Sequence, residues 1–354
     1  LSDDAQKKIL RWENSMMKTM FVILSLLLAS CSALELPKLL LTSVDVRSVD
    51  VGSSEVEFDA YTAGAENEAV CLVDVREKSR GRFRKPLFLA TKVDFATFKK
   101  RVRQEAKKIK ARNVMVHTHG FNVQPGGFFE AVDKGRKILE NEKILLVPVL
   151  WPCTKLRLPS FLGFVAYPLD QNNVPDGVSE QLVPLLELFA KIDEAVYATS
   201  IMCHSMGNYV LRWLAQKARE RRLWQRLLRR KGPHRRMKHV FMVAPDVRYD
   251  IFDEEKNSDM ANPEENPGKC IAKLCTGKVF VLHSSKDTAM VASNVQNWKN
   301  ALGRRGFRES KLHPDLKGKV VNVNCDDYNT IGGTAHGYQW TPGVVQQVYA
   351  KNLA

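Results

Sequence analysis

Short apolar runs alternate along the chain with longer stretches that carry an apolar residue at every third or fourth position. The runs are rich in β-branched residues, which predicts strands at 55–61, 70–75, 113–118, 144–150, 196–203, 239–244, 278–283 and 319–323. The longer stretches predict helices at 97–110, 127–141, 180–191 and 207–222. From 113 onward the strands are apolar throughout and alternate with helices, which is typical of a parallel sheet covered on both faces. The pattern predicts one α/β domain over residues 34–354.

The first 33 residues are expected to be an N-terminal extension and a targeting segment. A short start with Lys18 is followed by the apolar run 21–29, which is shorter than the roughly 20 residues of a membrane span. The run ends in Leu28-Ala-Ser-Cys31, which resembles a bacterial lipobox and predicts lipidation of Cys31. Export as a membrane-anchored lipoprotein is therefore expected. Cleavage after Ala33 to a periplasmic or secreted protein, and a buried apolar helix, are the alternatives.

Charge is concentrated in two segments. The formal net charge is +15, of which residues 212–238 hold +11 and residues 99–112 hold +7, so the rest of the chain is close to neutral at −3. The segment 212–238 extends a predicted helix and mixes arginines with Leu223 and Trp224, a basic amphipathic pattern. On an exported protein this pattern favours an anionic membrane surface over nucleic acid. A solvated helical extension is the simpler alternative.

The composition is that of a globular protein with 44% apolar residues, which excludes a disordered or fibrous chain. The seven cysteines show no paired spacing of the kind that binds zinc. Cys270 and Cys275 are close enough in sequence to form a disulfide in an oxidising compartment, and free thiols fit the sequence as well.

The clearest chemical motif is Cys203-His-Ser-Met-Gly207, between a predicted strand and a predicted helix. A strand, Ser-x-Gly and a helix in this order predict a nucleophile elbow, in which a sharp turn exposes the hydroxyl of Ser205. The elbow needs small residues two positions before and after the serine, and Gly207 meets this need. Cys203 stands where glycine is usual. The alternative is that Ser205 is only a helix N-cap.

A serine hydroxyl needs a histidine to take its proton and a carboxylate to orient that histidine. Functional residues of a doubly wound sheet lie at the carboxyl ends of its strands. Asp287 follows the strand at 278–283, and His336 follows the last strand. The order Ser205, Asp287, His336 is that of the α/β-hydrolase fold. Asp246, at the end of the strand after the serine, is the alternative acid.

The segment His117-Thr-His119-Gly-Phe121 ends the strand at 113–118. In this fold the loop there gives one oxyanion-hole N–H, assigned to Phe121, and the residue after the nucleophile, Met206, gives the other. The pair His117 and His119 also resembles a metal-ligand pair. Because Phe121 follows where a metallohydrolase would carry an acid, no metal is expected.

Several motifs in this order resemble a bacterial branch of the α/β-hydrolase superfamily that is catalogued as having unknown function. They are His119-Gly-Phe-Asn122, Trp151-Pro152 with Tyr167 and Asp170 downstream, His204-Ser-Met-Gly-Asn208, Ala244-Pro-Asp-Val247, Ser284 to Asp287, Arg305-Gly306 and His336-Gly-Tyr338. The resemblance spans 88–338 and departs from the usual pattern at Cys203 and at Phe121, where tyrosine is usual. It implies an α/β-hydrolase fold and an esterase-like or lipase-like serine hydrolase without a cofactor.

Three classes of function fit the sequence. The first is a serine hydrolase that cleaves a small-molecule or lipid ester, and in second place an amide, through an acyl-enzyme. The second is a catalytically silent hydrolase scaffold at an anionic membrane surface, and the third is a basic surface binder, with nucleic acid not expected as its partner. An apolar insertion at 152–179 follows a strand end, which fits either a lid over Ser205 or a loop packed on the sheet. The sequence gives neither the substrate nor the oligomeric state.

Overall fold

The computed structural model describes residues 49–51, 54–58, 73–80, 86–92, 95–121, 125–149, 151, 199–220, 237–254, 266–291, 301–330 and 335–353. The chain divides into two compact units, 1–40 and 41–354, and every described residue lies in the second. The targeting segment with Cys31, the insertion 152–179, the predicted helix 180–191 and residues 221–236 of the basic extension lie outside the described residues.

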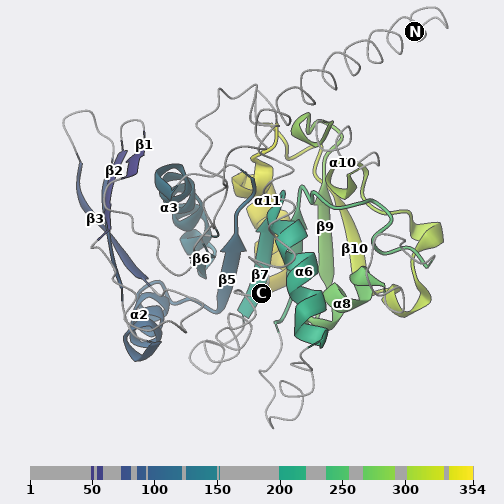
Figure 1. Ribbon diagram of the computed structural model, residues 1–354, viewed down its shortest axis with the longest axis horizontal. Coiled ribbons are helices and arrows are strands. Elements are labelled where there is room, and N and C mark those ends of the chain that lie inside the picture. The colour runs from purple at the N-terminus through teal and green to yellow at the C-terminus, as the bar shows by residue number, and fades with distance from the viewer. Residues whose placement is uncertain are drawn as a thin grey trace, which may run out of the picture. The chain divides into compact units, whose positions relative to one another are not determined.

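A six-stranded parallel sheet forms the centre of the second unit (Figure 1). Its strands are β5 (Asn113–Thr118), β6 (Ile144–Val149), β7 (Thr199–His204), β8 (Val240–Val243), β9 (Val279–His283) and β10 (Val320–Asn324). Their order across the sheet is β10-β9-β8-β7-β5-β6, and every neighbouring pair is parallel. All six strands agree with the predicted ones to within three residues at either end, which confirms the parallel α/β prediction.

The central strands of this sheet are buried on both faces, which is why they are mostly apolar. In β8, for example, Val240 and Met242 face one apolar cluster, whereas Phe241 and Val243 face another. The first cluster includes α2 (Phe95–Lys108), α6 (Gly207–Glu220) and α8 (Pro267–Lys273). The second includes α3 (Pro125–Asn141) and the C-terminal helical segment. This alternation within each strand produces the three-layered α/β arrangement.

The C-terminal segment continues through short helical turns. These are α10 (Leu302–Arg305), η3 (Glu309–Lys311), η4 (Pro314–Leu316), η5 (Tyr338–Trp340), α11 (Pro342–Val344), the π-helical η6 (Val345–Ala350) and α12 (Lys351–Leu353). Tyr338, Val345 and Tyr349 are fully buried against the sheet. The pattern of the sequence did not predict these turns or α8, because none reaches the length at which a helical period is visible.

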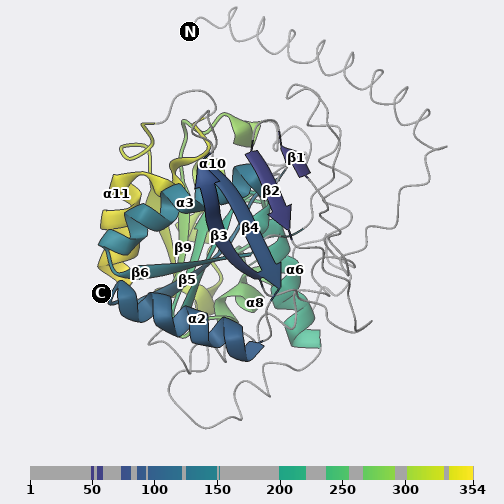
Figure 2. The same cartoon turned by 90° about the vertical axis from the view of Figure 1, so that its left-hand side faces the viewer.

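A second sheet of four strands precedes the main one in the chain (Figure 2). It contains β1 (Val49–Val51), β2 (Ser54–Phe58), β3 (Val73–Arg80) and β4 (Pro86–Lys92), in the order β1-β2-β4-β3. β1 and β2 contact α3, and β3 contacts α2. The sequence predicted β2 and β3 but not β1 or β4.

The ends of the parallel strands form two edges of the sheet. The carboxyl edge is where the six strands end, and the amino edge is where they begin. Since β5 runs upward in Figure 1, the carboxyl edge is the upper one.

Cys270 and Cys275 are both free and buried, so a disulfide between them is excluded.

Among the described residues, no helix is long and apolar enough to cross a membrane.

Candidate active site

Ser205 occupies a sharp turn between β7 and α6, with a positive backbone φ of 52°. A residue other than glycine in this region is strained by roughly 1–3 kcal/mol, so neighbouring structure must hold it there. The Ser205 N–H donates to the carbonyl oxygen of Val243 at 2.9 Å, and its own carbonyl oxygen accepts from the N–H groups of Asn208 and Asp246. The elbow is thus fixed to the ends of both β7 and β8.

The turn also packs tightly against the end of β5. A Cβ atom at Gly207 would lie 2.5 Å from the carbonyl oxygen of His119, and one at Gly120 would lie 2.8 Å from Cβ of Ser205. Only glycine allows such close approach at these two positions. Cys203, where glycine is usual, is fully buried within β7 opposite Thr118. Burial raises the pKa of the Cys203 thiol to about 12, so this side chain is a neutral part of the core.

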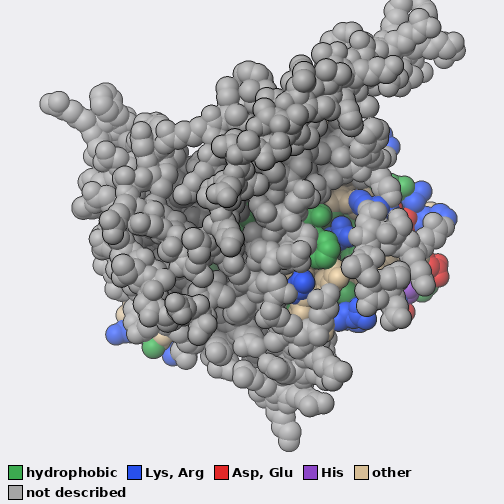
Figure 3. All heavy atoms as spheres, viewed as in Figure 1, with side chains coloured by type: hydrophobic (Ala, Val, Ile, Leu, Met, Phe, Trp, Pro, Cys, Tyr) green, Lys and Arg blue, Asp and Glu red, His purple; other side chains and the backbone are tan. Residues whose placement is uncertain are grey.

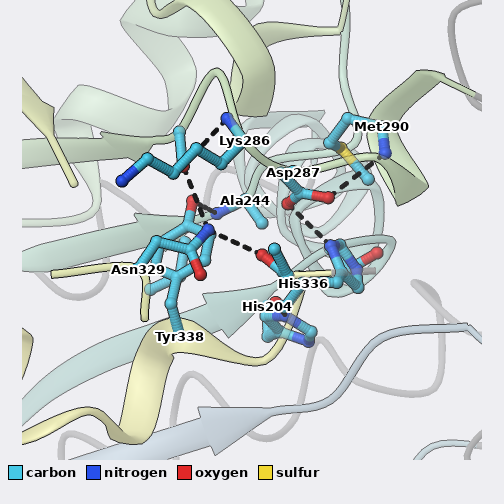
Figure 4. A network of polar contacts seen from close by, with 12 residues as sticks. His204, Ala244, Lys286, Asp287, Met290, Asn329, His336 and Tyr338 are labelled. Atoms are coloured by element: carbon cyan, nitrogen blue, oxygen red, sulfur yellow. Dashed lines mark hydrogen bonds and ion pairs between the residues drawn. The ribbon is translucent and has the colours of Figure 1, made fainter. Parts of the chain in front are cut away.

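A histidine and a carboxylate meet beside this elbow (Figure 4). His336 Nδ1 lies 2.8 Å from Oδ2 of Asp287, at hydrogen-bond distance. Asp287 is completely buried, and its Oδ1 accepts from the Met290 N–H at 3.3 Å. The carboxylate that contacts His336 is therefore Asp287. Asp246, the alternative acid, is buried nearby and is held to the elbow through its backbone N–H.

His204 links the elbow to the segment that carries His336. Its Nε2 donates to the carbonyl oxygen of His336 at 2.9 Å, and the two rings lie 4.6 Å apart between centroids. Burial lowers the pKa of His204 well below 6.5, and the charge of a protonated His336 would lower it further. His204 thus acts as a neutral hydrogen-bond donor, and it holds the backbone of His336 next to the residue that precedes Ser205.

Polar side chains tie the loops after β9 and β10 together (Figure 4). Asp326 accepts from the hydroxyl of Ser284 at 2.8 Å and from the N–H and hydroxyl of Ser285. The buried amide of Asn329 donates to the Ser284 hydroxyl at 3.0 Å and to the Ala335 carbonyl oxygen at 2.7 Å. Because Ala335 precedes His336 and Ser284 begins the loop to Asp287, this network fixes both partners of the 2.8 Å contact.

Tyr338 provides a second support from the core. Its hydroxyl donates to the Leu282 carbonyl oxygen at 2.9 Å and accepts from the Ala244 N–H at 3.1 Å, which joins the ends of β9 and β8. Burial raises the pKa of Tyr338 well above 10, so the hydroxyl keeps its proton.

Met206 and Phe121, the residues assigned to an oxyanion hole, each lie next in the chain to a residue of the packed elbow. Met206 stands between Ser205 and the first residue of α6, and its N–H donates no hydrogen bond to any described residue. Phe121 follows Gly120, whose backbone lies against Ser205. A backbone N–H that protein groups leave unused at a helix start is suited to stabilise a developing negative charge.

His117 and His119 face different surroundings. The ring of His119 stacks on Trp151 at 5.1 Å between centroids, and its two nitrogens contact backbone groups of Gly120 and Trp151. The ring of His117 packs edge-on against Trp340. Burial lowers the pKa of His117 to about 3 and that of His119 to about 4, so both rings are neutral. Within the described ranges, no group of three residues is arranged to bind a metal ion.

The supporting residues of the site were not identified from the sequence. Nothing in the sequence marked Asp326, Asn329 or Tyr338 as a support of this loop. A single Asn in a loop has no spacing signal, since its role depends on two groups 6 and 45 residues away in the chain.

Residues 94–333, two thirds of the chain, match the model of a family described as "Alpha/beta hydrolase of unknown function (DUF900)". The chain belongs to this hydrolase family. The match confirms the resemblance and the fold that the sequence predicted. It carries no substrate, since the family description names none.

Solved structures with limited similarity to this hydrolase include the poly(3-hydroxybutyrate) depolymerase LpqC from Bordetella parapertussis, at 14% identity over 69% of this chain and 85% of that chain, with a TM-score of 0.40. The RedJ thioesterase of the prodiginine pathway in Streptomyces coelicolor is 13% identical over 68% and 85% of the chains, with a TM-score of 0.33. An esterase from Pyrobaculum calidifontis is 12% identical over 74% and 93%, with a TM-score of 0.35. No curated protein matches the chain.

Proposed function

We propose that this hydrolase cleaves an ester through an acyl-enzyme formed on Ser205, with an amide as the second candidate substrate. The observation that carries the proposal is the 2.8 Å contact between His336 Nδ1 and the buried Asp287 carboxylate, beside a serine held in a strained elbow. A buried carboxylate that accepts from one ring nitrogen of a histidine leaves the other nitrogen free to act as a base.

In the proposed reaction, His336 donates its Nδ1–H to Asp287, so Nε2 carries the lone pair. Nε2 takes the proton of Ser205 as Oγ attacks the ester carbon. The alkoxide leaving group then departs with the proton from His336, which leaves the acyl group on Oγ. A water molecule attacks this acyl group, gives one proton to His336, and releases the acid as Oγ recovers its proton. Asp287 stabilises the histidine each time it is positively charged.

The N–H groups of Met206 and Phe121 are proposed to bind the oxyanion of both tetrahedral intermediates. Removing one donor of this kind typically lowers the rate by about two to three orders of magnitude. The N–H of Met206, which directly precedes α6 and donates to no described residue, supports its part in this role.

A fluorophosphonate probe tests the proposal directly, because it reacts only with an activated serine. We expect the wild type to be labelled and Ser205→Ala to remain unlabelled, with Ser310→Ala, which changes an exposed serine on η3, labelled like the wild type. Circular dichroism and thermal unfolding of all three proteins give the folding control. A folded wild type that the probe does not label would overturn the proposal and favour a catalytically silent scaffold.

A panel of p-nitrophenyl esters with acyl chains of two to about twelve carbons would define the substrate class. Hydrolysis that depends on Ser205 and peaks at one chain length gives the size of the acyl pocket. The predicted anchoring is tested separately: mass spectrometry of the mature N-terminus shows whether Cys31 is lipidated after export.

A further inference from the structure

The amino edge of the parallel sheet carries a series of basic residues. Five of the six strands begin within three residues of a Lys or Arg, and the residues immediately before β7 lie outside the described part of the chain. These residues are Lys110 and Arg112 before β5, Lys143 before β6, Lys238 before β8, Lys278 before β9, and Lys317 and Lys319 before β10. Because parallel strands all begin at one edge, positions that are far apart in the chain come together there.

The helices add further positive charge at the same edge. α2 ends with Lys107 and Lys108, α6 has Lys217 and Arg219 in its last turn, and α8 ends with Lys273. Figure 3, in the view of Figure 1, shows basic side chains beside the regions of α2 and α8. Lysine near a helix C-terminus is favoured by the helix dipole, which also favours Lys110 and Lys143, each two residues after a helix. The dipole does not account for Lys238 and Lys278, which follow no described helix so closely.

Most of the basic residues that precede strands are exposed and unneutralised. Five of them have exposed side chains that form no ion pair with any described residue. These are Lys110, Arg112, Lys143, Lys278 and Lys317. Lys238 and Lys319 donate to backbone carbonyl oxygens instead, Lys238 to Leu353 and Lys319 to Cys275 and Thr276. Their charges are therefore not cancelled by a carboxylate of the described residues. The acidic residues nearby are Glu142, next to Lys143, Glu105, which pairs with Lys108 at 3.6 Å, and Asp315, which pairs with Lys269 at 2.8 Å.

Two of these lysines occupy backbone positions that favour glycine. Lys110 follows α2 with φ 53°, and Lys143 follows α3 with φ 57°. A helix commonly ends with a glycine in this left-handed conformation, because a side chain is strained there. Lysine at both positions is therefore unfavourable for the backbone, whereas its charge is favoured there by the helix dipole.

We propose that the amino edge is a docking surface for an anionic phospholipid bilayer. Each Lys or Arg that approaches an anionic bilayer increases the affinity of the protein for that bilayer roughly fivefold. Lipid is favoured over single-stranded nucleic acid because no Phe, Tyr or Trp among the described residues is exposed at this surface to stack on bases. The test below distinguishes lipid from duplex DNA. The strands are about 20 Å long, so docking by the amino edge keeps the carboxyl edge with Ser205 facing away from the lipid.

The test measures binding of the full chain to vesicles of phosphatidylcholine with or without 30% phosphatidylglycerol, by sedimentation at two salt concentrations. We expect the anionic vesicles to bind at least tenfold more tightly, and this preference to fall with salt. Lys110→Gly with Lys143→Gly is the decisive variant, because glycine relieves the backbone strain. Its unfolding temperature should rise while its affinity for anionic vesicles falls about twentyfold.

The matched control removes two charges elsewhere. Lys134 on α3 and Arg305 on α10 are exposed, and Lys134→Gln with Arg305→Gln should leave vesicle binding unchanged. Equal losses in the two double variants, or unchanged binding in the glycine variant, would overturn the proposal. Binding to a DNA duplex is measured for the same variants. If the glycine variant lost binding to the duplex but not to vesicles, the proposal would be overturned in favour of nucleic acid. Since Ser205→Ala should bind vesicles like the wild type, the outcome is independent of the proposed hydrolase activity.

Discussion

The two edges of the parallel sheet use polar residues in opposite ways. At the carboxyl edge, Asp287 and Asn329 are buried and held by specific hydrogen bonds, and His204 is a neutral donor. At the amino edge, residues such as Lys143 and Lys278 are exposed and have no ion-pair partner among the described residues. Buried polar groups give geometric precision because leaving one unsatisfied is costly, whereas exposed charges give only a diffuse field that salt weakens. The comparison predicts that single substitutions have large effects at one edge and small effects at the other.

The largest effect is expected for the acid of the proposed triad. Asp287→Asn should lower kcat for p-nitrophenyl acetate by about 10³–10⁴-fold, because the amide no longer stabilises a positively charged His336. Asp246→Asn, which changes the alternative acid, should lower kcat by less than about tenfold. Steady-state kinetics of both variants decide between the two carboxylates, and the reverse order of effects would assign the role to Asp246.

Acid should destabilise the protein through the buried histidines of the carboxyl edge. The folded-state pKa of His119 is lowered to about 4, against about 6.5 in the unfolded chain. Between these values the unfolded state binds a proton that the folded state does not, so the free energy of unfolding falls as the pH falls. His119 alone accounts for about 3 kcal/mol between pH 6.5 and pH 4.

Urea denaturation at several pH values measures this slope. His119→Gln should flatten it, whatever the variant's stability at neutral pH. A slope that is identical in the wild type and the variant would show that other groups cause the acid sensitivity.

Glycines at the two edges should respond differently to alanine. Gly207→Ala would bring a Cβ atom to 2.5 Å from a backbone oxygen at the carboxyl edge, and overpacking of this kind costs about 2–3 kcal/mol. Gly318, near the amino edge, has φ +73° and open space around it, so Gly318→Ala should cost only the backbone strain of about 1 kcal/mol. Thermal unfolding compares the two, and esterase activity should fall in Gly207→Ala alone.

The smallest effects are expected for the exposed lysines. Lys278→Gln and Lys317→Gln should each change the free energy of unfolding by less than about 0.5 kcal/mol and leave kcat unchanged, since both lie a strand length away from Ser205. A change in kcat of tenfold or more would show that the two edges are coupled.

The sequence determined the elements of the main sheet and one part of the site. Strands such as β5 and β9 are apolar because both of their faces are buried, and that requirement is visible in the sequence without knowledge of their neighbours. The strand, Ser-x-Gly and helix around Ser205 form a local motif, which explains why its position at the end of β7 was predictable.

Only the tertiary structure decided which distant groups meet. The sequence predicted Asp287 as the acid and kept Asp246, at another strand end, as the alternative. The contact of His336 with Asp287 depends on how the loops after β9 and β10 pack together. The same is true of the support from Asn329 and of the free state of Cys270 and Cys275. Periodicity reports whether a residue is buried, but hydrogen bonds depend on distance and direction between segments that the folded core brings together.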